Sequence, residues 1–301
     1  MRHMKIKKDP KITSSELDFI EEIKKLTVIA MFADDDLMEM IVLKGGNAMN
    51  IIYGMADRAS IDLDFSMSAD FKKDELNIIE SKITKTLQST FSAAGYTVFD
   101  IRFVERPQVV RAPKDFWGGY RVNFKLIEKA LHEENKDNLA LMRKKARTVG
   151  IHGKKTFQID ISKFEYCEEK EKTKVGGYTV YVYTPKMIVF EKVRAICQQM
   201  PEYRAIIETM RPAPRARDFF DIYMLLNKFP FDIYEESNVN LLRAIFEIKK
   251  VPFGLLSKID GYREYHRADF SSLQATVRPS LKLEEFDYYF DYVVERFGRV
   301  I

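Results

Sequence analysis

Cysteine is scarce in this sequence, and its scarcity excludes the sites that thiolates usually build. The two copies, Cys167 and Cys197, lie far apart and form no C-x-x-C pair. Neither a zinc site nor a disulfide framework is expected, and the reducing cytoplasm is the predicted location. The histidines have no metal-ligand spacing and support no Ser-His-Asp or Cys-His arrangement; they are His3, His132, His152 and His266.

Long apolar runs are also missing. No stretch approaches the ~20 apolar residues that a membrane-spanning helix needs. The basic segment 1–10 lacks the apolar stretch of a signal peptide. We therefore expect a soluble, intracellular protein without membrane contact.

An excess of charge of one sign is absent as well. The chain has 49 Lys and Arg against 45 Asp and Glu, a net charge of +4. A chain so balanced does not coat a polyanion along its whole length, so any surface for nucleic acid must be local. The pattern G-x-x-x-x-G-K-[ST] does not occur, which excludes a P-loop NTPase.

The length and apolar content suit two domains, since the chain has 301 residues of which 46% are hydrophobic. Strand-like runs predict a mixed sheet flanked by helices, an α+β fold with an α/β-type core; they lie at 61–66, 96–104, 120–127, 157–161 and 178–183. Helical periodicity then prevails, at 187–200, 217–229, 239–248 and 283–297. We predict a sheet domain at 1–184 and a mostly helical C-terminal domain at 185–301.

A pair of glycines follows the first apolar run. Residues 40–43 are apolar, and Lys44-Gly45-Gly46-Asn47 comes directly after them. This order predicts a strand that turns sharply into a short helix, 47–53, closed by Gly54. Backbone N–H groups exposed at such a turn suit a phosphate.

Two carboxylates alternate with apolar residues in Ile61-Asp62-Leu63-Asp64-Phe65. In a strand, period-2 alternation places Asp62 and Asp64 on one face and the apolar residues on the other. Neighbouring carboxylates repel unless a cation lies between them, and hard oxygen ligands suit Mg²⁺ or Mn²⁺. Asp160, which alternates with apolar residues in 157–161, is the candidate third carboxylate. The alternative for all three is an exposed strand acid.

Two later blocks carry further charged candidates. In Glu191-Lys192-Val193-Arg194, a cation on a helix could reach the phosphates and neutralise the pyrophosphate that leaves. The alternative is an ordinary solvated helix face. Asp218 and Asp221 share one face of the next helix. An Arg-Asp network there could link two helices, or it could hold Lys192 in position.

A basic stretch at 138–159 contains no acid. It is interpreted as a local RNA-binding patch, with a solvated charge run in an insertion as the alternative. The residues assigned to it are Arg143, Lys144, Lys145, Arg147, Lys154 and Lys155.

Together these blocks closely resemble the AbiEii/AbiGii toxin family of the DNA polymerase β-like nucleotidyltransferase superfamily. The matching segments are Lys44-Gly45-Gly46-Asn47-Ala48-Met49-Asn50, Tyr53-Gly54, Arg58-Ala59-Ser60-Ile61-Asp62-Leu63-Asp64-Phe65, Glu191-Lys192-Val193-Arg194 and Arg215-Ala216-Arg217-Asp218-Phe219-Phe220-Asp221. The resemblance covers residues 40–225 in order. It implies a polymerase β-like catalytic domain at 1–184, a helical domain after it, and the toxin half of a toxin–antitoxin pair whose antitoxin is a transcriptional repressor.

The resemblance also implies roles for individual residues. Gly45 and Gly46 would hold the triphosphate of an NTP, and Asp62 and Asp64 would hold the metal ions. Asp160 is assigned to the metal site by inference from its strand. Lys192 would contact phosphate and Asp218 would complete the C-terminal motif. Lys44, Ser60 and Arg194 are assigned to the nucleotide site as well. Gly46 stands where the wider superfamily often has serine, so one hydroxyl contact is lost.

The expected function is metal-dependent transfer of a nucleoside monophosphate from an NTP to an RNA acceptor, with tRNA preferred, and release of pyrophosphate. One alternative is AMPylation of a protein or nucleotide transfer to a small molecule. Another is a catalytically silent module that binds an NTP or a partner.

Overall fold

A seven-stranded mixed sheet organises the first part of the chain in the computed structural model, which describes residues 14–56, 63–108, 115–148, 153–208, 210–278 and 280–300. The strand order is β3-β4-β5-β2-β1-β7-β6. The strands are β1 (Val42–Leu43), β2 (Leu63–Ser66), β3 (Tyr96–Arg106), β4 (Gly119–Glu128), β5 (Phe157–Ser162), β6 (Glu171–Val175) and β7 (Tyr178–Val182). Of the neighbouring pairs, β2–β5 and β1–β7 are parallel and the rest antiparallel. The expected mixed sheet and α+β class are confirmed.

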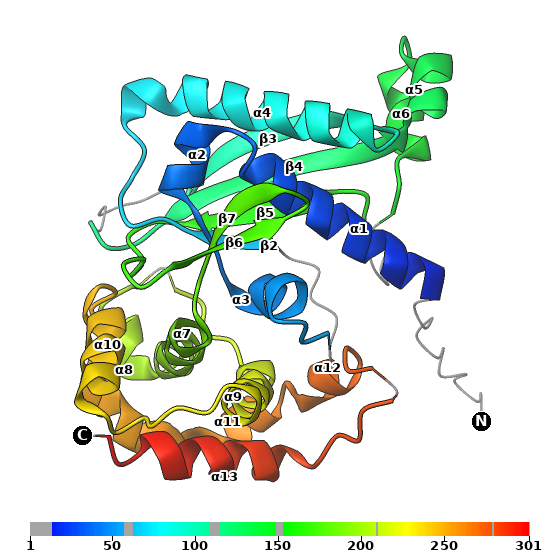
Figure 1. Cartoon of the computed structure of the whole chain (residues 1–301). Coiled ribbons are helices and arrows are strands. Elements are labelled where there is room, and N and C mark those ends of the chain that lie inside the picture. Colours follow the sequence, from blue (N-terminus) through cyan, green and yellow to red (C-terminus); the bar gives the residue numbers. More distant parts are fainter. Residues whose placement is uncertain are drawn as a thin grey trace, which may run out of the picture.

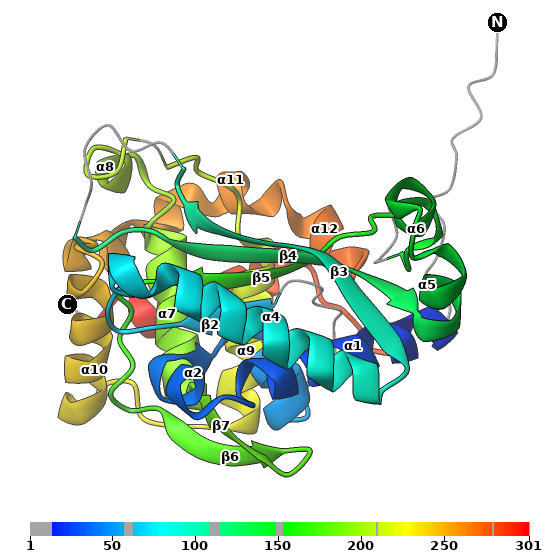
Figure 2. The ribbon, with the colours of Figure 1, turned by 90° about the horizontal axis from the view of Figure 1, so that it is seen from above.

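Most helices of the sheet part lie on one side of the sheet or at one of its ends, whereas α3 lies below the sheet in Figure 1. Figure 1 shows α1 and α4 above the sheet, while Figure 2 shows α5 and α6 at one end, well away from α7 and α9. The helices are α1 (Ser14–Met31), α2 (Asp35–Met40), α3 (Gly45–Asn47), η1 (Ala48–Ile52), η2 (Lys73–Glu75), α4 (Leu76–Ala93), α5 (Lys129–Asn135) and α6 (Leu139–Lys145).

The rest of the chain is helical and lies below the sheet in Figure 1. Its elements are α7 (Pro185–Cys197), α8 (Pro201–Arg204), α9 (Ala216–Lys228), α10 (Glu236–Glu247), η3 (Phe253–Tyr262), α11 (Arg263–Arg267), α12 (Phe270–Gln274) and α13 (Phe286–Phe297). The start of α7 has a clear local cause. The Thr184 side chain accepts a hydrogen bond from the Met187 N–H at 3.2 Å, and Pro185 occupies the first turn.

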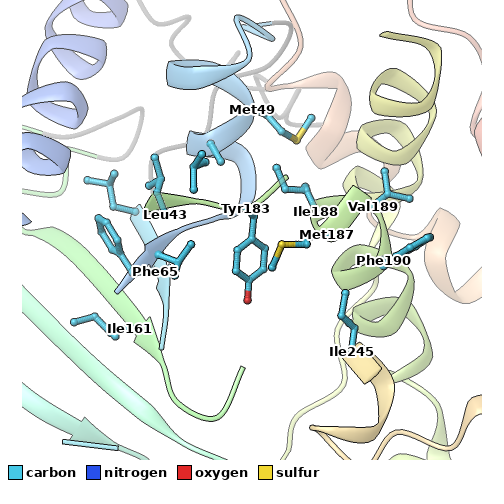
Figure 3. Close-up of a cluster of buried hydrophobic side chains, with 14 of the residues drawn as sticks. Leu43, Met49, Phe65, Ile161, Tyr183, Met187, Ile188, Val189, Phe190 and Ile245 are labelled. Atoms are coloured by element: carbon cyan, nitrogen blue, oxygen red, sulfur yellow. The ribbon is translucent and has the colours of Figure 1, made fainter. Parts of the chain in front are cut away.

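The buried core runs from the sheet into the helices. Figure 3 shows Leu43, Phe65 and Ile161 on β1, β2 and β5, Met187 on α7 next to Tyr183, and Phe190 farther along α7, where it packs against Phe231 and Phe297. All of these side chains except the half-buried Phe231 are buried, and they pack together in one continuous cluster. Burying a large apolar side chain stabilises a fold by about 1.5–3 kcal/mol, so α7 is anchored firmly against the strands that carry the polar site.

The domain boundary expected after residue 184 coincides with the N-cap of α7. Since the core is continuous across that point, the division into domains 1–184 and 185–301 stays a prediction. None of the helices in the described ranges is both long and apolar enough to cross a membrane.

Candidate active site

The glycine turn connects β1 to α3. Helix α3 begins at Gly45, two residues earlier than the sequence predicts, and continues as the π-helical turn η1. Gly45 has φ +65°, and a Cβ there would lie 3.4 Å from Asp64 Oδ2. The positive φ favours glycine, because this left-handed conformation is costly for other residues, whereas the contact with Asp64 is of ordinary van der Waals length. The backbone N–H of Lys44 also donates to the Asp64 carbonyl at 3.1 Å, which fixes the turn against β2.

Asp64 and Asp160 lie side by side. They are register partners on the parallel strands β2 and β5, whose backbones run about 4.8 Å apart. Leu63 and Phe65 are buried and Asp64 is half-buried, so the predicted alternation of faces holds here. Asp62 and Ser60 lie outside the described residues.

Arg121 is one of the residues that sequence reasoning missed. It lies on β4, and its register partner is Asp160. Its Nε donates to Asp160 Oδ1 at 2.7 Å and its Nη2 to Oδ2 at 2.8 Å. Such a bidentate pair is stronger and more directional than a single charged hydrogen bond. The strand-like run 120–127 was recognised, but only the register of β4 with β5 brings Arg121 to Asp160.

Lys44 lies in a buried group of charges. Its Nζ donates to Glu191 Oε1 at 2.9 Å and to Ser162 Oγ at 3.3 Å, and it lies 3.6 Å from Glu165 Oε1. Burial alone would lower the pKa of Lys44, but the charges of Glu165, Glu191 and Asp64 outweigh it and raise that pKa above its ordinary value. Lys44 therefore carries a permanent positive charge beside the glycine turn.

Glu165 connects Lys44 to two other buried cations. Its carboxylate lies 3.2 Å from Arg194 Nη2 and 3.2 Å from Lys249 Nζ. Burial would raise the pKa of Glu165, but the three cations together lower it. Arg194 is buried here and does not line the cavity described below. Its position favours a structural role, and the nucleotide contact expected for Arg194 is not retained.

Lys192 is held between two acids of α9. Its Nζ lies 2.9 Å from Asp218 Oδ1 and 2.7 Å from Asp221 Oδ2, and all three side chains are buried. Of the two roles considered for the Arg-Asp network, these contacts favour the one in which it holds Lys192 in position. Arg215 Nε donates to the other oxygen of Asp218 at 2.5 Å.

Arg215 is tied to the site electrostatically. The charge of Asp218 is the main cause that raises the pKa of Arg215, and Asp64 contributes to the same shift. The Arg215 backbone N–H donates to Nδ1 of the buried His266 at 3.1 Å. Burial lowers the pKa of His266 to about 4, so at neutral pH its ring is uncharged and can accept this bond.

These groups surround a cavity of about 460 Å³ between the sheet, α7 and α9, a volume typical of small-molecule sites. Its lining residues are Lys44, Gly45, Gly46, Asp64, Asp160, Glu191, Lys192, Ala195, Pro214, Arg215, Arg217, Asp218 and Asp269. The structure thus brings together Lys44, both glycines, and the three described acids and the lysine of the predicted catalytic set. It adds Arg215, Arg217 and Asp269, which the sequence did not single out as site residues.

Carboxylate oxygens of Asp64 and Asp160 are the donor type that Mg²⁺ and Mn²⁺ prefer. Among the described residues no group of three or more His, Cys, Asp or Glu side chains is placed to hold a metal ion. The two in-register carboxylates fit such an ion in donor chemistry, and the other carboxylate of the Asp62-x-Asp64 motif, Asp62, falls outside the described ranges.

The basic stretch lies on and after α6, away from the cavity. Arg143 donates to both oxygens of Asp100 at 2.6 Å. These hydrogen bonds are the main cause that lowers the pKa of Asp100 to about 2. Arg147 Nη1 lies 3.4 Å from Glu128 Oε1, and Lys155 donates to the Lys144 carbonyl. Part of the stretch is therefore engaged within the chain, while Lys144, Lys145 and Lys154 are exposed.

A family model described as "Nucleotidyl transferase AbiEii toxin, Type IV TA system" matches residues 28–292. Among solved structures, the chain is similar to an antigenic nucleotidyltransferase-like protein from Paracoccidioides brasiliensis, with 14% identity and a TM-score of 0.37, covering 90% of this chain and 98% of that one. The chain has no match among curated proteins.

Proposed function

The chain belongs to the AbiEii family of nucleotidyl transferase toxins, and from that premise we propose that it transfers a nucleoside monophosphate from an NTP to an RNA acceptor, with tRNA the first candidate. The observation that carries the proposal is the convergence of the glycine turn, Asp64 with Asp160, and Lys192 on one cavity. Phosphate, carboxylate and cation sites within one volume are what nucleotidyl transfer requires, because that reaction depends on positioning and charge stabilisation.

The glycine turn and the cations would bind the triphosphate. The backbone N–H groups of Gly45 and Gly46 are proposed to contact its phosphates. Lys192, held by Asp218 and Asp221, and Arg215 would offset negative charge as pyrophosphate leaves. Because Lys192 is already fixed by its acidic partners, it loses little freedom when phosphate arrives.

Asp64 and Asp160, with Asp62 from the sequence motif, are proposed to hold Mg²⁺ or Mn²⁺. The ion would neutralise charge on the triphosphate when bound. Because carboxylates and phosphates repel each other, the cations Lys192 and Arg215 would orient the triphosphate toward an acceptor hydroxyl that enters from the open side of the cavity. The in-register placement of Asp64 and Asp160 on neighbouring parallel strands supports their assignment to the ion.

The exposed lysines of the basic stretch are proposed to contact RNA phosphates. From Arg121, which pairs with the cavity-lining Asp160, to Glu128 at the base of α5, β4 extends for seven residue steps, about 24 Å. A folded RNA at least that long could place one end in the cavity and its backbone against α6. An antitoxin is a further proposed partner, on the ground of family membership.

A labelling experiment tests the proposal. Purified protein with Mg²⁺ and each α-labelled NTP is offered small RNA, total protein or neither, next to Asp64→Asn, Asp160→Asn and the exposed control Asp74→Asn. We expect label in small RNA with the wild type and Asp74→Asn. Asp64→Asn should lose at least 100-fold in rate, the order that one removed charge-stabilising group costs.

Other outcomes redirect the proposal. Label in protein would replace the RNA acceptor by an AMPylation target. Full transfer by a folded Asp64→Asn would contradict the assignment of the cavity. NTP binding without transfer to any acceptor would favour a silent binding module.

A further inference from the structure

Arg121 stands apart from the motifs that place this chain in its family, yet it touches the proposed metal site. The partner strands β4, β5 and β2 place Arg121, Asp160 and Asp64 next to one another in that order. Both oxygens of Asp160 accept from the same guanidinium. A divalent ion at Asp160 would therefore share that carboxylate with a fixed positive charge.

We propose that Arg121 is a positioning residue that weakens cation binding at the Asp64–Asp160 pair, so that the site takes its cation together with the triphosphate rather than alone. The inference rests on the proposed function for the identity of the pair as the metal site. Its physical basis is separate, since it concerns only the charges that surround two carboxylates.

Each of the two carboxylates has cationic neighbours. Asp160 has Arg121, whereas the charge of Asp64 acts on Lys44 and Arg215 and raises the pKa of both. Lys44 and Arg215 are themselves paired with Glu191 and Asp218, so the reduction in net negative charge comes chiefly from Arg121, which offsets one of the two charges that the pair would offer a lone cation. A triphosphate supplies the missing negative charge and can contact Lys44 or Arg215 at the same time, so cation and nucleotide would bind cooperatively.

The bidentate contact also restricts the geometry of Asp160. A carboxylate has about four lone-pair positions, and the guanidinium engages one on each oxygen. Asp160 then keeps lone-pair positions for an ion, but the two N–H donors of Arg121 fix the orientation of its carboxylate plane. A lysine at 121 would supply the charge without the fork.

The ion pair between Arg121 and Asp160 adds little to the stability of the fold. The side chains of Arg121 and Asp160 are 30% and 31% exposed, and ion pairs with such access to solvent contribute modestly. Replacement of Arg121 should therefore leave the fold intact, which makes the proposal open to direct measurement.

The test measures Mn²⁺ binding to the full chain without NTP, and electron paramagnetic resonance detects the bound ion. Arg121→Met should bind Mn²⁺ about tenfold more tightly than the wild type, equivalent to ~1.4 kcal/mol. Arg121→Lys should fall between them, and Asp160→Asn should bind more weakly. Arg102→Met, an exposed arginine on the neighbouring strand β3, is the matched control and should match the wild type.

A second arm adds a non-hydrolysable NTP analogue. The tenfold difference between wild type and Arg121→Met should shrink, because the triphosphate supplies the negative charge in both. Unchanged, weaker or undetectable Mn²⁺ binding by folded Arg121→Met would overturn the inference. Mn²⁺ binding needs no acceptor, so it can be measured and interpreted even if the transfer assay detects no activity.

Discussion

At the scale of single residues, Gly45 joins the phosphate-binding turn to the carboxylate strand. Its left-handed backbone means that even a single methyl group would strain the turn, and that methyl group would lie in van der Waals contact with Asp64. Lys44 and Asp64 are already tied by a backbone hydrogen bond at this point. A shift of the turn would therefore move the carboxylate as well.

Gly45→Ala should lower stability by about 1–2 kcal/mol, the cost of a left-handed conformation in an L-residue. It should also weaken NTP binding, because relief of the strain would shift the backbone N–H groups that are proposed to bind the phosphates. Gly254→Ala is the matched control, since a Cβ there meets nothing within 4 Å and its φ is not positive. Urea unfolding and NTP titration measure both effects. Equal effects of the two substitutions would contradict this role of Gly45.

The same scale shows what the sequence could predict. Alternation in β5 placed Asp160 on the polar face, and the structure agrees because Phe157, Ile159 and Ile161 are buried. Arg121 could not be assigned, because its partner lies on a strand separated from β4 by the α5–α6 insertion. Arg194 and Lys192 occupy one helix block, yet only Lys192 lines the cavity. Tertiary packing around α7, which periodicity does not report, separates their roles.

At the scale of elements, apolar periodicity correctly predicted most strands and helices, whereas the polar strand β6 was missed. The strands β3, β4, β5 and β7 and the helices α7, α9, α10 and α13 overlap the predicted runs. Strand β6 was missed because Glu171-Lys172-Thr173-Lys174 has no apolar alternation. It forms by pairing with β7 at the sheet edge, where lysines also discourage pairing with other chains.

Helix α6 gives a prediction at this scale. Replacing Lys144, Lys145 and Lys154 by glutamine should weaken RNA binding and lower the slope of log K against log salt by about 2–3, at ~0.7–0.9 per phosphate contact. The control replaces the three lysines of the β6 region, Lys170, Lys172 and Lys174. Filter binding at several salt concentrations measures the slopes. Equal losses from both triple variants would argue against a specific RNA surface at α6.

At the scale of the whole molecule, one lysine of the helical part reaches into the sheet part. Lys249 Nζ donates to the Lys163 carbonyl at 2.6 Å and lies 3.2 Å from Glu165 Oε1. Burial is the main cause that lowers the pKa of Lys249 to about 8, against the attraction of Glu165. Burying the charged amine of Lys249 therefore costs folding free energy, although its contacts join the two parts of the chain.

The pH dependence of global stability should report this lysine. Below pH 8 the amine is protonated in both the folded and the unfolded chain, so the cost of burying its charge is fully present. As the pH rises above 8, the folded chain releases the proton while the unfolded chain, with its ordinary pKa near 10.5, retains it. Stability from this group therefore increases, by about 1.5 kcal/mol between pH 8 and 9.5.

Lys249→Met should lack that increase, so the difference in unfolding free energy between the two proteins should change by this amount over the same range. The comparison cancels the titration of groups that do not contact Lys249, and Glu165, which does, has a pKa of about 2, far below this range. Urea unfolding at pH 8.0, 8.5, 9.0 and 9.5 provides the measurement. If the two curves stay parallel, Lys249 does not titrate in this range, and its ammonium is held charged by Glu165 strongly enough to offset its burial.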